Sequence, residues 1–212
     1  MPLITDIRMT RQRVSRLELW LDGAPALCIA PDTALRFHLK KGLELDADRV
    51  REIEQADEAL KARQALARYT ALSVRSERQA RAALARRAFR PEAIESAITH
   101  GLERGWIDDR AVAYALIRQR AASRPAGPAR LRAELMAKGI TPDLAEDALM
   151  ALGPDEAAQK EAARRQSLKR LAVWRGRYDE NELRRRLRDY LARQGYEPAL
   201  AAEVAREVVG GQ

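Results

Sequence analysis

The sequence has few residues from which a metal site or a disulfide could be built. Cys28 is the only cysteine among 212 residues, which excludes an internal disulfide and is typical of a reducing compartment. With only His38 and His100 besides, a zinc site of the usual ligand spacings cannot be assembled. The chain also contains no Gly-x4-Gly-Lys phosphate loop and no Gly-x-Ser-x-Gly nucleophile elbow. We therefore expect no metal, no cofactor and no enzymatic activity.

Long hydrophobic runs are lacking as well. The longest uninterrupted apolar stretch is residues 111–117, far below the roughly 20 residues of a membrane-spanning helix. The N-terminus lacks the basic-then-apolar pattern of a signal peptide. We expect a cytoplasmic protein that has no membrane partner.

Aromatic residues are scarce, at 5% of the chain, and alanine supplies much of the 46% that is hydrophobic. Small side chains give thin cores, so a short helical unit of this composition needs a neighbour for stability. Stacking on nucleic-acid bases requires clustered aromatics, and Trp106, which follows a helix stop, is better explained as a packing residue. Any nucleic-acid contact is therefore expected at the phosphate backbone.

A pattern of helix, stop and proline recurs three times in the chain. We read it as a helix that ends in a left-handed residue, an apolar side chain that closes the corner, and a proline that starts the next helix. The aligned columns are Leu84, Leu135 and Leu191; then Ala88, Gly139 and Gly195; then Phe89, Ile140 and Tyr196; and then Pro91, Pro142 and Pro198.

Each copy also has a helix in front of it, so the repeated unit is three short helices. We predict a mainly α-helical protein whose three tandem three-helix repeats form an elongated, curved array. The predicted boundaries are 46–105 for a linker helix with the first repeat, 106–153 for the second repeat and 154–212 for the third.

Several residues predict where individual helices begin and end. Ser76 with Gln79 three residues later is typical of a capping box, and Asp108 is expected to cap the helix that follows it. Asp32 is expected to cap a short helix that runs to about residue 40. Gly127-Pro128 is expected to stop one helix and start the next.

Residues 1–45 differ from the rest and predict a small β-rich module, with strands between residues 3 and 29. Leucines alternate with other side chains in residues 16–21, Asp22-Gly23 is typical of a hairpin turn, and residues 26–29 form the returning strand. Ile4 and Ile7 indicate a further strand before these. A few strands rarely form a stable fold by themselves.

Positive charge is concentrated in the repeats. The chain has a net charge of +8, and residues 59–105 carry ten Lys and Arg against four Asp and Glu. Residues 1–58 carry nine against eleven. Such a field favours polyanions or acidic protein surfaces as partners.

One arginine column recurs in the second helix of every copy, at Arg81, Arg132 and Arg188. A single arginine is a good helix former with a solvated charge, and that explanation stands for each one alone. We interpret the recurring column as functional, because guanidinium groups bind phosphate or carboxylate in two-point geometry. The candidates for filament or nucleic-acid binding are Arg81, Arg86, Arg87, Arg118, Arg120, Arg130, Arg132, Lys138, Arg184, Arg185, Arg186 and Arg188.

The chain resembles the RecX family, the bacterial modulators of the RecA recombinase. The motifs that carry the resemblance are GWIDD at 105–109, RQR at 118–120, GPARL at 127–131 and ELMAKGI at 134–140. The likeness covers roughly residues 59–209, and the β-rich start is similar to an extension that some members carry. Val112 departs from the pattern, because the family places an aromatic residue after the Asp pair.

The resemblance implies a monomeric, curved helical body that lies in the groove of the RecA filament on single-stranded DNA. Such a protein would block filament extension or promote disassembly, and so restrain recombination, ATP hydrolysis and the co-protease activity of the SOS response to DNA damage. Direct contacts to DNA phosphates are left open. The alternative is a helix-turn-helix-like nucleic-acid-binding regulator that acts without RecA.

Overall fold

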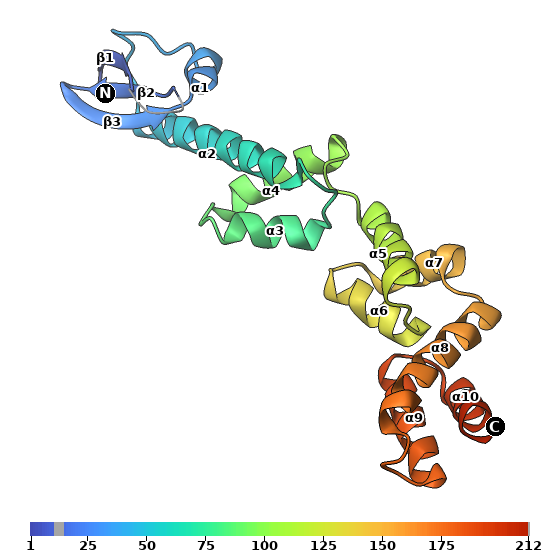
Figure 1. Cartoon of the computed structure of the whole chain (residues 1–212). Helices are drawn as coiled ribbons and strands as arrows, with labels where there is room; N and C mark the ends of the chain where they lie inside the picture. Colours follow the sequence, from blue (N-terminus) through green and yellow to red (C-terminus); the bar gives the residue numbers. More distant parts are fainter. Residues whose placement is uncertain (11–14, 212) are drawn as a thin grey trace. The chain divides into compact units, whose positions relative to one another are not determined.

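The computed structural model describes residues 1–10 and 15–211, and the chain forms two compact units, Met1–Ile107 and Asp108–Gln212 (Figure 1). Residues 11–14 belong to the stretch predicted to form strands and lie outside the described residues. Among the helices in the described ranges, none combines the length and the apolar character needed to cross a bilayer.

The first unit starts with an antiparallel sheet whose strands follow the order β1 (Ile4–Met9), β2 (Leu17–Leu21) and β3 (Ala24–Ile29). The predicted hairpin turn is confirmed, because Asp22 and Gly23 both have positive φ, 48° and 86°. β3 begins two residues earlier than predicted and includes Pro25. An edge strand tolerates proline, and the pairing register of β2 with β3 shifts beside it.

Helix α1 (Pro31–Arg36) is shorter than the sequence pattern predicted. Its N-cap is Ala30, and Asp32 lies within the first turn and does not cap the helix. Pro31 occupies the first helical position, where its fixed φ suits the start of a helix. The proline therefore sets the beginning of α1 one residue before the aspartate.

The sheet builds its core together with helix α2 (Ala47–Thr70). Ile4, Leu19 and Ile29 are at most 2% exposed and belong to one hydrophobic cluster with Ile53 of α2. Three short strands bury too little apolar surface to be stable alone. The β-rich segment thus depends on the first helix of the first repeat.

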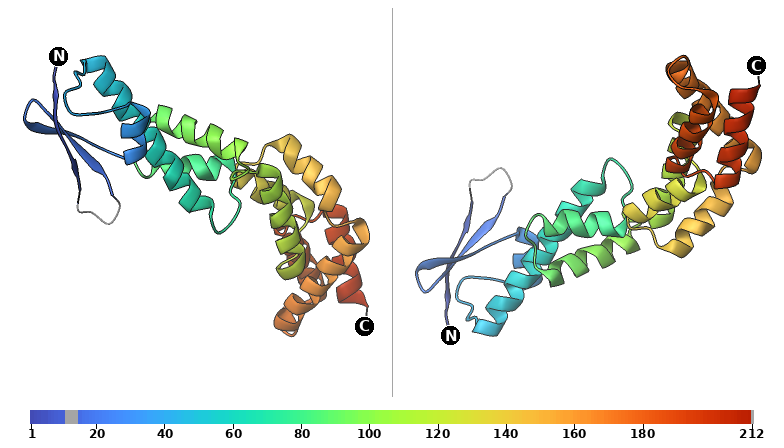
Figure 2. Two further views of the ribbon diagram at one scale, coloured as in Figure 1. Left: turned by 90° about the horizontal axis from the view of Figure 1, so that it is seen from above. Right: turned by 90° about the horizontal axis from the view of Figure 1, so that it is seen from below.

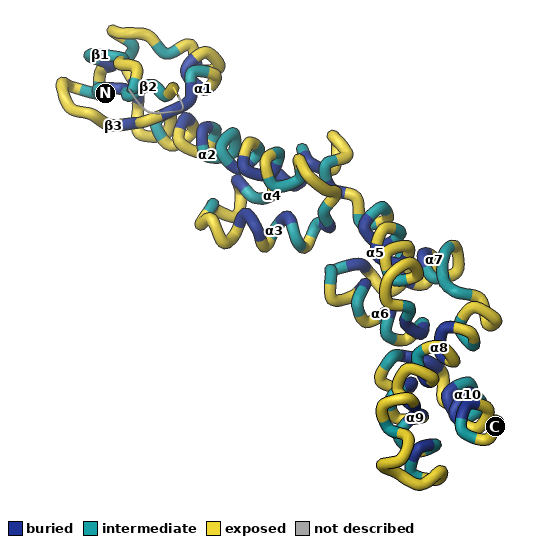
Figure 3. Tube along the Cα trace, in the orientation of Figure 1, coloured by how far each residue is buried: buried dark blue, intermediate teal, exposed yellow. Residues whose placement is uncertain are grey.

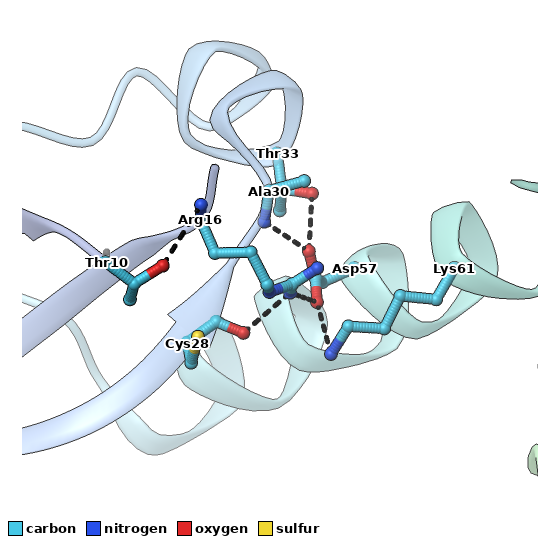
Figure 4. Close-up of polar contacts among 7 residues, drawn as sticks. All are labelled: Thr10, Arg16, Cys28, Ala30, Thr33, Asp57 and Lys61. Carbon is cyan, nitrogen blue, oxygen red and sulfur yellow. Dashed lines mark hydrogen bonds and ion pairs between the residues drawn. The ribbon is translucent and has the colours of Figure 1, made fainter. Parts of the chain in front are cut away.

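A buried aspartate of α2 connects this segment to the helix (Figure 4). The Asp57 side chain is 3% exposed, and its Oδ2 lies 2.6 Å from Arg16 Nη2 and 2.9 Å from Lys61 Nζ. Its Oδ1 accepts hydrogen bonds from the N–H of Ala30 at 2.7 Å and from Thr33 Oγ1 at 3.1 Å. One carboxylate of α2 therefore ties together α1, the residue that follows β3 and the residue that precedes β2.

The same contacts determine the protonation of Asp57. Burial by itself would raise the pKa of this carboxyl, but the N–H of Ala30 and the cations Lys61 and Arg16 outweigh it. The pKa consequently lies below its ordinary value of 3.8. The group is charged at neutral pH, which is the state that all its partners favour.

The helical part contains three successive groups of three helices, drawn from two further directions in Figure 2. Each group encloses its own hydrophobic cluster, and Figure 3 shows buried stretches in the helices of all three groups. The mainly helical fold with a small N-terminal sheet is as predicted. After α2 the helices are α3 (Glu77–Ala85), α4 (Pro91–Glu103), α5 (Asp109–Ser123), α6 (Pro128–Ala137), α7 (Pro142–Leu152), α8 (Glu156–Trp174), α9 (Glu180–Arg193) and α10 (Pro198–Gly210).

The corner between the second and third helix of each group has the predicted backbone conformation. Ala88, Gly139 and Gly195 have φ of 58°, 92° and 84°, which is the left-handed region. The residue after each glycine then bonds back to the second helix. The N–H of Ile140 donates to the carbonyl of Leu135, and that of Tyr196 donates to the carbonyl of Leu191, both over 3.2 Å. The corner therefore brings the third helix back against the second.

Two predicted helix caps are confirmed. Ser76 and Gln79 form the reciprocal capping box at the start of α3. The Asp108 carboxylate accepts a hydrogen bond of 2.9 Å from the N–H of Ala111 at the start of α5.

Within the second unit, a close backbone contact joins the second and third helical groups. The N–H of Gly127 donates to the carbonyl of Gln194 at 2.9 Å, and that of Ala129 donates to the carbonyl of Gly195 at 3.2 Å. The donors lie at the start of α6 and the acceptors at the end of α9, so each helix end satisfies the unpaired groups of the other.

This contact corrects the role expected for Gly127. Helix α5 already ends at Ser123, so Gly127 does not stop it. A Cβ on Gly127 would lie 2.1 Å from the carbonyl oxygen of Gly195, closer than any side chain permits. The glycine is required because another backbone passes directly over it.

We predict that Asp57→Asn lowers the free energy of unfolding by about 3 kcal/mol at pH 7, because it leaves Arg16 without its buried counter-charge. Since the pKa of Asp57 is lowered by folding, its contribution is complete above the unfolded value of 3.8 and is lost as the pH falls through the folded value. The variant should therefore lose less stability than the wild type as the pH falls below about 3.8.

Urea unfolding at several pH values measures this effect, and hydrogen exchange of β2 and β3 localises it. Asp48→Asn is the control, because Asp48 is 85% exposed and its pair with Arg51 lies on the surface of the same helix. Equal acid sensitivity of the wild type and of Asp57→Asn would contradict the assignment.

Ala88→Gly is expected to raise the free energy of unfolding by about 1 kcal/mol, because Ala88 has a left-handed φ of 58° that costs an L-residue energy. Thermal unfolding followed by circular dichroism measures the change. Ala82→Gly is the matched control in the middle of α3, and it should lower stability by about 1 kcal/mol. Destabilisation by both variants would refute the strain at Ala88.

Candidate functional site

The candidate functional residues are the basic side chains of the repeats, and the structure shows which of them are engaged inside the chain. Among residues 1–10 and 15–211, no three His, Cys, Asp or Glu side chains converge in a way that could hold a metal ion. Trp106 packs against the first helical cluster, and its ring meets that of His100 edge to face at 5.2 Å.

Two members of the arginine column form the same ion pair in two different repeats. Arg81 of α3 contacts Glu95 of α4, and Arg132 of α6 contacts Glu146 of α7. In both pairs Nη2 donates to Oε2 at 3.0 Å, a second guanidinium nitrogen donates to Oε1, and the residues are 14 positions apart. The second helix is thereby linked to the third by a two-point contact.

These contacts shift the ionisation of both partners toward the charged forms. The hydrogen bonds from Arg81 and Arg132 lower the pKa of Glu95 and Glu146, and the carboxylates raise the pKa of the arginines. All four side chains are more than a third exposed, so solvent screens the attraction. In the first two repeats, the column residue has a structural partner within its own repeat.

The third member of the column has a different environment. Arg188 of α9 is exposed and forms no hydrogen bond or ion pair with any residue that the structure describes. The residue 14 positions later, where the other repeats have glutamate, is Ala202. The three column arginines, which look equivalent in the sequence, therefore have different partners in the structure.

Arg120 and Arg130 are held in a network between α5, α6 and the end of α9. Arg120 makes a two-point contact with Glu134, at 2.7 and 2.9 Å, and Arg130 Nε donates to the same carboxylate at 3.1 Å. Arg130 also donates through Nη1 to Gln194 Oε1 at 2.7 Å, which links the second repeat to the third. Glu134 is 22% exposed, so this network is more protected from solvent than the column pairs.

The arginine run on α9 is largely matched by acids of the same helix. Arg184 pairs with Glu180 at 2.8 Å, while Arg185 and Arg186 both lie within 2.9 Å of Glu182. Hydrogen bonding from Arg185 lowers the pKa of Glu182. Much of the apparent positive charge of this helix is therefore balanced locally.

The remaining candidates are dispersed. Arg86 and Arg87 are exposed where α3 ends, and Arg118 is exposed on α5. Arg87 also lines a cleft of about 400 Å³ with residues of β3 and α2. Lys138 is the C-cap of α6 and lines, with Arg124, a cleft of about 530 Å³ between α5 and α6.

Some important residues were not predicted from the sequence. Lys160 of α8 lies 2.6 Å from Glu203 and 2.7 Å from Glu207, and so connects α8 to α10. Both carboxylates raise the pKa of Lys160. The sequence contains one indication that Asp57 is buried, because this acid lies four residues after Ile53 on the apolar side of α2. Its partners could not be predicted, since they come from segments far away in sequence.

The comparisons with known proteins agree on one family. Residues 108–149 match the family model for the second three-helix domain of RecX. Regulatory protein RecX of Geobacillus kaustophilus is 30% identical over 220 residues, which cover 96% of this chain and 76% of that protein.

Solved structures show the same fold. A crystal structure of a regulatory protein RecX aligns over the full length of both chains with a TM-score of 0.76 and 24% identity. That of RecX from Lactobacillus salivarius aligns with a TM-score of 0.63 and 20% identity, covering 72% of this chain and 97% of the other. The similar curated proteins are named as regulatory proteins.

We predict that Glu134→Gln lowers the free energy of unfolding of the second unit by about 2 kcal/mol, because two partly buried guanidinium groups lose a charged acceptor. Chemical denaturation followed by tryptophan fluorescence measures the change. Glu146→Gln removes the same charge from the exposed Arg132 pair and should have a much smaller effect. Equal losses in the two variants would show that the Glu134 network contributes no more to stability than the exposed Arg132–Glu146 pair.

Proposed function

The chain belongs to the RecX family of regulatory proteins, and we propose that it is a negative regulator of the RecA recombinase that binds the RecA filament on single-stranded DNA. In this proposal the protein blocks filament extension or promotes disassembly. It thereby inhibits recombination, ATP hydrolysis and the co-protease activity of RecA in the SOS response.

The observation that carries the proposal is the recurrence of one helical design along the chain. Three groups share the buried leucine, the left-handed corner and the proline start, at Leu84, Leu135 and Leu191 and the residues that follow them. A repetitive protein of this kind suits a repetitive partner, because each repeat can contact an equivalent position on a successive subunit.

Several weak contacts in one chain would also allow the regulator to act at low concentration. Once one repeat is bound, the others meet their sites at a high effective concentration, so the total affinity exceeds that of any single contact. A protein that contacts successive subunits also covers the surface on which the filament must rearrange. Inhibition then requires no chemistry by the regulator itself.

The in-chain ion pairs suggest an order of importance among the basic candidates. Arg86, Arg87, Arg118 and Arg188 are exposed, and no ion pair holds them within the described part of the chain. We assign these four the main role in binding the filament. The other candidates, which are Arg81, Arg120, Arg130, Arg132, Lys138, Arg184, Arg185 and Arg186, are assigned a supporting role.

We further propose that the protein acts as a monomer in the cytoplasm. The alternative, a helix-turn-helix-like regulator that binds nucleic acid without RecA, draws support from the same exposed arginines, because guanidinium groups also bind phosphates. It differs in its salt dependence, since each phosphate contact releases counterions.

The wild-type protein is expected to slow RecA ATP turnover on single-stranded DNA at substoichiometric amounts. A variant with both Arg87→Glu and Arg118→Glu should inhibit about fivefold more weakly, because two charges facing the partner are reversed. The measurement is steady-state ATP hydrolysis as a function of regulator concentration.

The matched control is the double variant Lys40→Glu and Lys41→Glu, which has the same change in charge at exposed residues outside the candidate set. No effect of equimolar wild-type protein on RecA would refute the proposed function. Sequence-dependent binding to DNA in the absence of RecA, with a steep dependence on salt, would favour the alternative.

A further inference from the structure

The third repeat lacks an acid that the first two repeats possess. In these two repeats, a glutamate on the third helix receives the column arginine in a two-point contact, as Glu95 receives Arg81 and Glu146 receives Arg132. The equivalent position in the third repeat is Ala202, on α10. The third repeat still has the column arginine, Arg188, and the two helices α9 and α10 that correspond to the paired helices of the other repeats.

The neighbouring positions in the third repeat are also more basic. Arg184 lies one helical turn before Arg188 on α9, and Arg206 lies one turn after Ala202 on α10. The Nε of Arg206 donates over 3.4 Å to the carbonyl of Ala202, so this side chain lies back toward the position of the missing acid. We call these four residues, Arg184, Arg188, Ala202 and Arg206, the α9–α10 seam.

The same columns in the first repeat have the opposite charge. There they hold Glu77, Arg81, Glu95 and Thr99, whose formal charges add to −1, while those of the α9–α10 seam add to +3. Helices α9 and α10 pack against each other, as α3 and α4 do (Figure 1). The first and third repeats therefore share this pair of packed helices but differ in the charge of the side chains at these positions.

Acidic residues near the seam have other partners. Glu203 and Glu207 of α10 contact Lys160 of α8, at 2.6 and 2.7 Å. Glu180 pairs with Arg184 at 2.8 Å, but both side chains are more than a third exposed and the pair is screened by solvent. None of these acids takes the place that Glu146 occupies beside Arg132.

We propose that the α9–α10 seam binds an aspartate or glutamate side chain of a protein partner, whose carboxylate occupies the place of Glu95 and Glu146 in the other repeats. The site deepens the proposed function and rests on it, in that the partner is the recombinase filament. The two internal pairs show directly that this arrangement of helices presents the arginine to a carboxylate in two-point geometry.

The surroundings favour a carboxylate over a nucleic acid. Binding of single-stranded nucleic acid uses aromatic rings on which bases stack. Each nearby tyrosine ring already has a guanidinium over one face, since that of Arg170 lies 4.9 Å from the centre of the Tyr190 ring and that of Arg186 lies 4.0 Å from the centre of the Tyr178 ring. The seam thus offers charge and geometry without a platform for bases.

The test is to supply the missing acid within the chain. Ala202→Glu places a carboxylate where Arg188 can pair with it, and it should weaken inhibition of RecA ATP turnover about tenfold. It should also weaken binding of a fluorescently labelled polyglutamate peptide by a similar factor, measured by anisotropy. The folded state should be at least as stable as that of the wild type, because the other two repeats accept the same pair.

Three control variants separate the causes. Ala202→Gln has the same size without the charge and should behave as the wild type. Ala133→Glu, at an exposed position of α6, makes the same change in net charge away from the seam and should have little effect. Arg188→Ala should reproduce the loss seen with Ala202→Glu.

The outcomes distinguish the two proposals. If wild-type protein binds polyglutamate and Ala202→Glu does not, the seam stands as a carboxylate site even if the wild-type protein leaves RecA turnover unaffected, a result that would refute only the proposed function. Unchanged polyglutamate binding by Ala202→Glu would refute the proposal that the seam is a carboxylate site. If Ala202→Glu instead loses affinity for a single-stranded oligonucleotide in the absence of RecA and keeps its affinity for polyglutamate, the seam is assigned to phosphate.

Discussion

The left-handed residue at the end of each second helix is the constraint on which the repeats depend. Because the backbone reverses at Ala88, Gly139 and Gly195, the third helix returns along the second and covers a buried leucine. The same reversal places the residue 14 positions after the column arginine opposite its guanidinium, as the Arg81 and Arg132 pairs show. A single backbone conformation therefore sets both the core of a repeat and the spacing of charges on its surface.

Cores built largely from alanine bury little apolar surface, and the chain compensates by sharing structure between neighbours. The β-sheet completes its core with Ile53 and connects its strands through Asp57, both of which belong to the first repeat. The N–H groups at the start of α6 are satisfied by carbonyls at the end of α9, a contact that only Gly127 permits. Within each of the two units, one part is thus completed by its neighbour, as expected for a repeat protein.

Repetition of a structure does not imply repetition of its role. The column arginine is used inside the chain in two repeats and is left exposed in the third, where Ala202 replaces the glutamate. Once a backbone framework is stable, single substitutions at its surface can convert an internal ion pair into a binding position for another protein. This difference within one column accounts for the specialisation that we infer for the third repeat.

The sequence by itself determined the features that depend on local backbone preferences: the three helical groups, the corners at Ala88, Gly139 and Gly195, the hairpin turn at Asp22-Gly23 and the caps at Ser76 and Asp108. These follow from φ preferences and hydrogen bonds within a few residues, which a sequence displays directly. Only the tertiary structure decided which arginines are engaged, why Gly127 is a glycine and what Asp57 holds together. Each of those answers depends on partners up to 68 positions away, such as Gly195 for Gly127, and packing alone brings such residues into contact.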